Sequence, residues 1–276
     1  MTAKKEFMRK PLFNKVCIIG VGLIGGSLGL AIKKRRLAKF VVGVARRKQS
    51  AIQAVSRKAL DMATLDLKEG VRGADLIILA GPIPTIISQI KLLSKCVSPN
   101  SVIMDVGSSK AQIGLAAKQF LKKNIFIGCH PMAGSEKCGI EFASENIFQD
   151  AICFVICRNE KVEKFWRVLG SKVICVHEKV HDAWVAKSSH LPHALSFSLF
   201  QMIDPKFPQN PSLRDMARLA KSNPELWADI FLSNREEVLK ASSEFKKNFF
   251  KFQKALQTKD RKTLIAFIKK ANRQQF

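Results

Sequence analysis

The 276-residue chain contains no tyrosine, although it has 19 phenylalanines and three tryptophans. It also has no apolar run near the roughly 20 residues that a membrane-spanning helix needs, so we expect no membrane association. The basic start, MTAKKEFMRKPLFNK, lacks the apolar segment of a secretion signal. Seven cysteines, an odd number without paired spacing, do not form a disulfide framework. Together these absences predict a cytoplasmic protein.

Acidic residues are scarce at both ends of the chain. Residues 1–60 contain one glutamate against 15 lysines and arginines, and residues 240–276 contain two acids against 11. A basic surface of this kind can attract nucleic acid. The aromatic residues among the C-terminal lysines, however, recur at helical spacing and predict a core face: Phe245, Phe249, Phe252 and, with them, Leu256. We therefore do not expect nucleic acid as a partner, despite the net charge of +25.

Short apolar runs alternate with helical segments between residues 15 and 178. The predicted strands are 16–20, 40–45, 75–80, 101–106, 125–128, 151–156 and 172–176, and the predicted helices are 24–36, 49–58, 84–94, 110–121 and 161–169. Continuous hydrophobicity in the strands indicates burial on both faces, as in a mostly parallel sheet. We therefore predict an α/β fold over residues 1–178, a doubly wound, Rossmann-like dinucleotide-binding domain.

The strand pattern stops after residue 178, and residues 179–276 predict an all-helical second domain. Its expected helices are 181–204, 212–222, 224–256 and 260–273, with a break at DPKFPQNP. The helix over 224–256 carries more apolar positions than one buried stripe accounts for. Surplus apolar surface on a soluble protein usually contacts a partner, so we expect this domain to mediate dimerisation.

The motif CIIGVGLIGGSLG places Gly20, Gly22 and Gly25 in G-x-G-x-x-G spacing after a strand and at the start of a helix. Gly20 allows a tight turn, Gly22 allows the backbone to approach a pyrophosphate, and Gly25 allows close helix–strand packing. The helix N-terminus, with Leu23 and Ile24, would complete the phosphate site. The alternative is a glycine-rich turn without a ligand.

The end of the second strand indicates which dinucleotide binds. NAD sites usually have Asp or Glu there to accept a hydrogen bond from the ribose 2′-hydroxyl. This sequence has Ala45, followed by Arg46, Arg47 and Lys48. Without an acid to repel a 2′-phosphate, and with two guanidinium groups to bind one, NADP is favoured and NAD remains possible. The missing acid is the stronger evidence, because the whole N-terminal region is basic.

Two loops after later strands should face the nicotinamide at the carboxyl edge of the sheet: DVGSSK, which contains Ser108, and GCHPMAGSE, which contains His130. We expect His130 to lie on a flexible, open loop. A neutral imidazole there could accept the proton of a substrate alcohol while hydride leaves the same carbon. His190 and His193 do not have zinc-motif spacing with Cys129 or His130, so we expect no metal site.

Six motifs resemble the prephenate and arogenate dehydrogenases of tyrosine biosynthesis, in the order of that family and over nearly the whole chain. They are GVGLIGGSLG, DVGSSK, HPMAGSEKCG, HDAW, SSHLPHAL and RDMARLAKSNPELWADIF. The resemblance implies oxidative decarboxylation of a cyclohexadienyl substrate with hydride transfer to NAD(P). It also implies an intertwined homodimer. The PQNPSL run before Arg214 is shorter than the glycine-rich run common in the family.

The resemblance also implies roles for individual residues. His130 would accept the hydrogen bond of the ring hydroxyl, and Ser108 would orient His130 and touch the nicotinamide. The expected substrate pocket consists of His181, Ser189 and His193, with Arg218 binding a carboxylate and Trp227 closing the pocket. Glu136 could pair with the ammonium group of arogenate, or it could point into solvent. Arg218 could instead form an ion pair with Asp215 or Glu225.

Two other functions are possible for the same fold, although the HPMAGSE loop argues against the first, and His130, Ser108 and Arg218 argue against the second. One is another two-domain NADP-dependent hydroxyacid or imine oxidoreductase, although such enzymes often use a catalytic lysine or aspartate on a helix. The other is a non-catalytic protein that senses dinucleotides or binds nucleic acid. The fold alone does not separate these functions.

Overall fold

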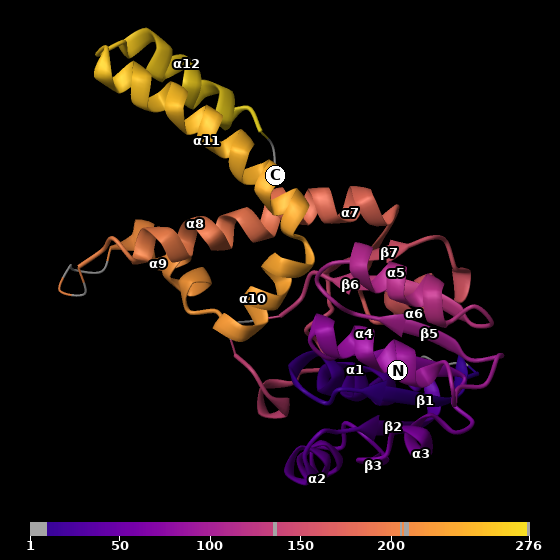
Figure 1. Cartoon of the computed structure of the whole chain (residues 1–276). Coiled ribbons are helices and arrows are strands. Elements are labelled where there is room, and N and C mark those ends of the chain that lie inside the picture. Colours follow the sequence, from indigo (N-terminus) through magenta and orange to yellow (C-terminus); the bar gives the residue numbers. More distant parts are fainter. Residues whose placement is uncertain (1–9, 135–136, 205, 207–209, 275–276) are drawn as a thin grey trace, which may run out of the picture.

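The computed structural model describes residues 10–134, 137–204, 206 and 210–274. It consists of an eight-stranded sheet with helices on both faces, followed by a helical region (Figure 1). The strands are β1 (Phe13–Ile19), β2 (Ala38–Val44), β3 (Met62–Thr64), β4 (Leu76–Leu79), β5 (Val102–Asp105), β6 (Ile125–Pro131), β7 (Ile152–Ile156) and β8 (Lys172–Val176). Their spatial order is β3-β2-β1-β4-β5-β6-β7-β8, which confirms the predicted doubly wound α/β fold.

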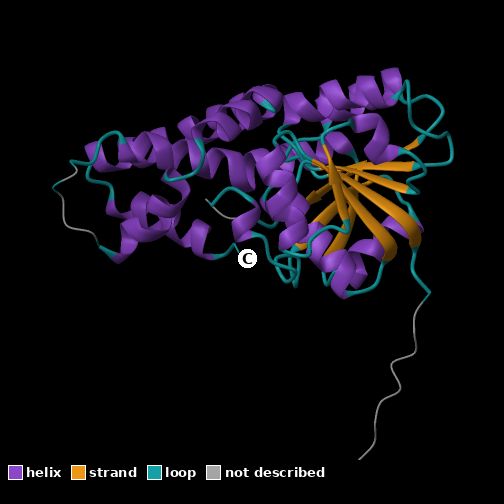
Figure 2. Ribbon diagram, turned by 90° about the horizontal axis from the view of Figure 1, so that it is seen from below, coloured by secondary structure: helices purple, strands orange, loops and turns teal. Residues whose placement is uncertain are grey.

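The sheet is parallel from β3 to β6, as predicted, and Figure 2 shows how it twists. Strand β7 pairs antiparallel with β6, and β8 pairs parallel with β7. The helices of this region are α1 (Leu23–Lys34), α2 (Lys48–Ser56), α3 (Leu67–Val71), α4 (Ile83–Leu93), α5 (Ala111–Phe120) and α6 (Glu160–Val168). The sequence did not predict β3 and α3, because both are short and neither contains a continuous apolar run.

The strands form two cores, one on each face of the sheet. In β1, Val16 and Ile18 pack into a cluster with residues of α1, α2 and α6, whereas Cys17 and Ile19 pack with residues of α3, α4 and α5. Successive side chains of a strand point to opposite faces, so a strand buried on both sides must be apolar at every position. This arrangement accounts for the unbroken hydrophobicity of the predicted strands.

The helical region begins directly after β8. Its elements are α7 (Glu178–Val185), the π-helical turn η2 (Ala186–His190), α8 (Leu191–Phe200), α9 (Pro211–Ala220), α10 (Pro224–Ser233), α11 (Arg235–Gln257) and α12 (Arg261–Asn272). Trp227 and Ile230 of α10 belong to the same core cluster as Ile83 and Ile86 of α4, so the helical region is joined to the sheet region by a shared core. In the described part of the chain, no helix is both long enough and apolar enough to cross a bilayer.

The single helix predicted over residues 224–256 is two helices. The break lies at Asn234, whose buried side chain donates hydrogen bonds from Nδ2 to the carbonyl oxygen of Asp182 and to Nδ1 of His190, at 2.9 and 3.2 Å. An asparagine that is used in tertiary hydrogen bonds can interrupt a helix whose periodicity continues on both sides.

The predicted core face of α11 is also wrong for a single chain. Helices α11 and α12 form a hairpin that extends away from the sheet (Figure 1). Phe249 and Leu256 are 45% and 51% exposed, and Phe245 stacks on Phe249 at 5.7 Å between ring centroids. Phe249 also contacts Phe252 of the same helix, and Phe252 contacts Phe267 of α12. The apolar stripe therefore lies on the surface of the described chain.

Candidate active site

The glycine motif forms a tight turn between β1 and α1. Gly20 has φ +99°, a left-handed conformation that favours glycine, and a Cβ on Gly20 would lie 2.8 Å from the carbonyl oxygen of Ala80. A Cβ on Gly25 would overlap the carbonyl oxygen of Gly20, so helix and strand approach each other as the motif predicts. Nothing lies within 4 Å of a Cβ on Gly22, which leaves its backbone open to a pyrophosphate. Leu23 and Ile24 form the first turn of α1.

The end of β2 carries no acidic side chain. Ala45 is buried directly after the strand, and its N–H donates to the carbonyl oxygen of Thr64 at 2.9 Å. Arg46 and Arg47 follow and are exposed, and Arg47 is the N-cap of α2 without a side-chain hydrogen bond in that role. The geometry and charge of this corner therefore fit a 2′-phosphate as well as a ribose hydroxyl.

His130 does not lie on an open loop, contrary to the sequence expectation. It is part of β6, pairs with Phe154 of β7, and is only 8% exposed. The antiparallel pairing with β7 explains this difference, because it extends β6 past Gly128, where the parallel pairing with β5 ends. His130 is therefore held on a strand at the carboxyl edge of the sheet.

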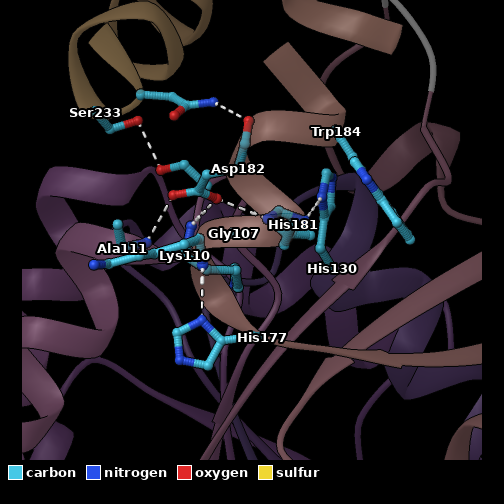
Figure 3. Close-up of polar contacts among 12 residues, drawn as sticks. Gly107, Lys110, Ala111, His130, His177, His181, Asp182, Trp184 and Ser233 are labelled. Carbon is cyan, nitrogen blue, oxygen red and sulfur yellow. Dashed lines mark hydrogen bonds and ion pairs between the residues drawn. The ribbon is translucent and has the colours of Figure 1, made fainter. Parts of the chain in front are cut away.

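A chain of hydrogen bonds runs from His130 to a carboxylate on α7 (Figure 3). His130 Nδ1 lies 2.9 Å from His181 Nε2, and His181 Nδ1 lies 2.7 Å from Asp182 Oδ1. Since an ionised carboxylate only accepts, His181 must donate from Nδ1 and accept at Nε2. His130 must then donate from Nδ1, so its Nε2 keeps the lone pair. The chain thereby assigns a tautomer in which Nε2 of His130 is a proton acceptor.

The electrostatics of the site keep both histidines neutral. Burial, followed by the charges of His181, Lys110 and His190, holds the pKa of His130 well below its usual value. Burial also lowers the pKa of His181, even though the hydrogen bond to Asp182 opposes that shift. Desolvation works against the charge of Asp182, but its hydrogen bonds to His181 and to backbone N–H groups outweigh it and lower the pKa of Asp182.

Asp182 is fixed by the N-terminus of α5. Its Oδ1 accepts a hydrogen bond from the N–H of Lys110 and its Oδ2 from the N–H of Ala111, each at 2.8 Å. These N–H groups belong to the first turn of α5, where helix N–H groups need acceptors outside the helix and the helix dipole favours an anion. Asp182 belongs to the HDAW motif, but no role for it was predicted from the sequence. The neighbouring His181 was the sequence feature that could have pointed to Asp182.

His181 differs from the expected placement. Its side chain is fully buried, between His130 and Asp182, and it contacts the ring of Phe154 at 5.2 Å between centroids. A fully buried imidazole behind His130 does not line a substrate pocket. Its polar contacts are with His130 and Asp182.

The other predicted pocket residues form a second group on η2, α8, α9 and α10. His193 Nδ1 donates to the carbonyl oxygen of Ser189 at 2.8 Å, and the ring of His193 stacks on Trp227 at 3.6 Å between centroids. Burial lowers the pKa of His193, the hydrogen bond with Ser189 opposes this shift, and the charge of Arg218 adds to it. Arg218 is exposed and forms no ion pair within the described chain, neither with Asp215 nor with Glu225.

Two predicted site residues, Ser108 and Glu136, belong to neither of these groups. Ser108 is half-buried in the loop that joins β5 to α5, at the same edge of the sheet as His130. Glu136 lies outside the described residues, as does part of the PQNPSL run before Arg214. No group of three or more His, Cys, Asp or Glu side chains suited to a metal ion occurs among the residues that the structure describes.

Comparison with known proteins places the chain in a family. Residues 28–174 match the family model for the nucleotide-binding domain of prephenate dehydrogenase, and residues 177–270 match the model for its dimerisation domain. The chain is 31% identical to a prephenate dehydrogenase of Lactococcus lactis subsp. cremoris, over 94% of this chain and 76% of the relative.

Solved structures agree with this result. A prephenate dehydrogenase from A. aeolicus, in complex with hydroxyphenyl propionate and NAD+, has a TM-score of 0.86 at 28% identity and covers 94% of this chain and 96% of its own. A Synechocystis arogenate dehydrogenase has a TM-score of 0.79 at 28% identity, covering 94% and 97%. The resemblance predicted from the sequence motifs is confirmed: the chain belongs to the prephenate dehydrogenase family.

Proposed function

We propose that the chain catalyses the NAD(P)-dependent oxidative decarboxylation of prephenate or arogenate. The observation that carries the proposal is the Asp182–His181–His130 chain, which ends in an unprotonated Nε2 at the carboxyl edge of a dinucleotide-binding sheet. The relatives named above are a prephenate dehydrogenase and an arogenate dehydrogenase. The A. aeolicus structure holds NAD+ and hydroxyphenyl propionate. The family and the site therefore support this function over the hydroxyacid, imine and non-catalytic alternatives.

The nicotinamide of a dinucleotide whose pyrophosphate is held at the glycine turn would accept a hydride from the ring carbon that carries the hydroxyl group. Nε2 of His130 accepts the hydroxyl proton as that hydride leaves. The C–C bond to the ring carboxylate then breaks, carbon dioxide is released, and its electron pair makes the ring aromatic. His130 returns the proton to the new phenol oxygen, so the reaction releases no net proton.

His181 and Asp182 act through His130. The carboxylate fixes the tautomer of His181, and His181 in turn accepts the Nδ1–H of His130 and holds its ring. With Asp182 ionised and both histidines neutral, one arrangement of protons satisfies both hydrogen bonds of the chain. We therefore assign His181 a positioning role, in place of the pocket contact that the sequence predicted. Ser108, at the same edge, is proposed to orient the substrate hydroxyl and touch the nicotinamide.

The second group is proposed to bind the rest of the substrate. The Nδ1 of His193 is engaged with Ser189, so its Nε2 can receive a hydrogen bond from the substrate, and Trp227 stacks on one face of the His193 ring. Arg218, without an ion pair in the described chain, suits a substrate carboxylate. Glu136 is proposed to pair with the ammonium group of arogenate, which favours arogenate over prephenate.

We further propose that residues 1–178 bind NADP in preference to NAD, and that residues 179–276 supply His193, Arg218 and Trp227 for the substrate and the homodimer contact. The absence of an acid at Ala45 and the exposed Arg46 and Arg47 support the cofactor preference. The match to a dimerisation domain supports the assembly. All seven cysteines are free thiols, which supports a location in the reducing cytoplasm.

Changing Arg46 and Arg47 together to alanine tests the cofactor preference. Affinity for NADP should fall by about tenfold or more, since charge-assisted hydrogen bonds to the 2′-phosphate are worth about 1.5–3 kcal/mol each. Affinity for NAD should change by less than about threefold. Titration calorimetry with both cofactors measures this difference. An equal loss for both would show that the two arginines act only through general charge.

Turnover of prephenate and arogenate, each with NAD and with NADP, tests the function itself. We expect measurable reduction of the cofactor with release of carbon dioxide, fastest with arogenate and NADP. Turnover of prephenate alone would overturn the role of Glu136 and leave the reaction intact. No turnover of either substrate by folded protein that binds the cofactor would overturn the proposed function.

A further inference from the structure

Lys110 is a buried charge that the proposed mechanism does not use. Its side chain is 2% exposed at the N-terminus of α5. The ammonium group forms an ion pair with Asp105, which is fully buried, and Nζ also donates to the carbonyl oxygen of Cys129 at 2.7 Å. Removing two charges from water is costly, and a buried ion pair is often no more stabilising than a well-packed apolar pair. Its placement therefore calls for a role other than stability.

The hydrogen bond to Cys129 lies at the point where the sheet changes direction. The parallel pairing of β6 with β5 ends at Gly128, opposite Asp105, and the antiparallel pairing with β7 begins at Cys129. The carbonyl group of Cys129 belongs to the peptide that leads into His130, and it accepts from Lys110. A hydrogen bond to this peptide fixes the backbone from which the His130 side chain projects.

Lys110 also holds the other end of the histidine pair. Its backbone N–H donates to Asp182 Oδ1 at 2.8 Å, and the same oxygen accepts from His181 Nδ1. One residue therefore contacts both the peptide before His130 and the carboxylate that accepts from His181. Figure 3 shows the contact with Asp182. A small displacement of Lys110 would move both ends of the chain Asp182–His181–His130.

We propose that Lys110, held by Asp105, is a positioning residue for His130: its ammonium group sets the backbone of His130, and its N–H anchors the carboxylate behind His181. This inference rests on the proposed function, because it takes His130 as the proton acceptor. Lys110 has no contact with reacting atoms and is not itself a catalytic residue.

The charge of Lys110 adds an electrostatic consequence. An ammonium group near His130 disfavours the imidazolium form and helps to keep the base neutral. The titratable groups packed around His130 are His181 and Asp182 of α7, His190 of η2, Lys110 and Asp105 of the β5–α5 connection, and Cys129 and Cys153 of β6 and β7. Lys110 is the cation in this set, so its removal should raise the pKa of His130.

The test replaces the ion pair without leaving an unpaired charge. In the double variant D105N/K110M, the methionine retains the length of the lysine stem but provides neither the ammonium group nor its hydrogen bond. We expect kcat to fall by about 10- to 100-fold, as for a slightly misplaced reacting group, while KM and cofactor affinity change by less than about threefold. The acidic limb of the kcat–pH profile should move to higher pH, because the imidazolium form of His130 is no longer opposed.

Two further variants make the result specific. K118M removes an exposed lysine from the same helix, where it pairs with Glu178, and should leave kcat and the pH profile unchanged. K110R keeps a cation that can donate to Cys129, so its kcat should exceed that of D105N/K110M by about tenfold. If D105N/K110M does not fold, as judged by circular dichroism, the comparison of K110R with the wild type carries the test, and K110R should keep the wild-type acidic limb.

A folded D105N/K110M with wild-type kcat and an unmoved acidic limb would overturn the positioning role. A folded K110R whose acidic limb moves to higher pH than that of the wild type would also overturn it, since a cation at this position would then not hold the pKa of His130 down. These outcomes are distinct from a failure of the proposed function, because that failure would appear as absent turnover in the wild-type enzyme.

Discussion

The edge of the sheet and the α11–α12 hairpin differ in how far their side chains are buried within the single chain. At the sheet edge, the polar groups of Lys110, Asp182 and His181 are buried and find partners within the same chain. Along the hairpin, Phe249 and Phe250 are 45% and 64% exposed, and the ring of Phe249 contacts Phe245 and Phe252 of the same helix. The first region is complete in one chain, whereas the second has an apolar face without a cover in the single chain described.

This difference separates two kinds of information in the sequence. Apolar residues at strand spacing specify a core that the chain buries by itself, as in β1 and β4. Apolar residues at helical spacing in α11 specify a surface that a second chain is expected to bury, in agreement with the match to a dimerisation domain. Changes at the two regions should therefore break different properties: chemistry at the sheet edge and assembly at the hairpin.

The largest expected effect is on assembly. Changing Phe249 and Phe250 together to lysine places two charges on the exposed apolar face of α11. Central aromatic residues of an interface are worth about 2 kcal/mol or more each, so the dimer dissociation constant should rise by about 10³-fold. Sedimentation velocity at micromolar concentration should then show a monomer, while the wild type sediments as a dimer.

The matched control is Leu115→Lys, which places a charge at a 66% exposed apolar position on α5 of the sheet region. It should leave the dimer intact. A wild-type chain that sediments as a monomer, or a Phe249 and Phe250 double variant that remains a dimer, would contradict the assignment of the hairpin to the interface.

A second effect concerns stability in acid. Burial lowers the pKa of His190 from 6.5 to about 4, so the unfolded chain binds a proton at higher pH than the folded chain does. The stabilising contribution is complete above pH 6.5 and is lost as pH falls toward 4, by about 3 kcal/mol at 1.36 kcal/mol per pKa unit. Urea unfolding at pH 7 and pH 4.5 measures the loss, which should be smaller in H190Q. An equal loss in H190Q would show that other groups cause it.

A third effect concerns substrate binding. Arg218→Ala should lower kcat/KM by about tenfold or more, because a charge-assisted contact with a carboxylate is worth about 1.5–3 kcal/mol. The change should appear mainly in KM, with cofactor affinity and thermal stability unaltered. Steady-state kinetics against the preferred substrate measures it. An unchanged KM would remove Arg218 from the pocket and return it to the solvated surface.

Much of the fold was predictable because strand burial and glycine geometry are local signals. The runs around β1, β4 and β5 and the Gly20 turn needed only sequence spacing to be recognised. The direction of β7 was not predictable in this way, because the apolar pattern of a strand buried on both faces is the same in either direction. That single reversal moved His130 from the expected loop onto a strand.

The candidate site was only half predictable for a related reason. The motifs identified His130 and His193, but Asp182 and Lys110, which belong to the hydrogen-bond network around His130, lie about 50 and 20 residues away in sequence. Helix periodicity likewise continued through Asn234, since the break depends on tertiary hydrogen bonds to Asp182 and His190. Long-range hydrogen bonds of this kind leave no periodic trace in the sequence.

The most direct test of the central claim, that His130 is the proton acceptor, is the single-turnover rate of cofactor reduction in His130→Asn. Asparagine retains much of the shape and a polar end but cannot accept a proton at neutral pH. The rate should fall by about 10²- to 10⁴-fold, with cofactor affinity near that of the wild type. A folded variant that reduces the cofactor at nearly the wild-type rate would contradict the account.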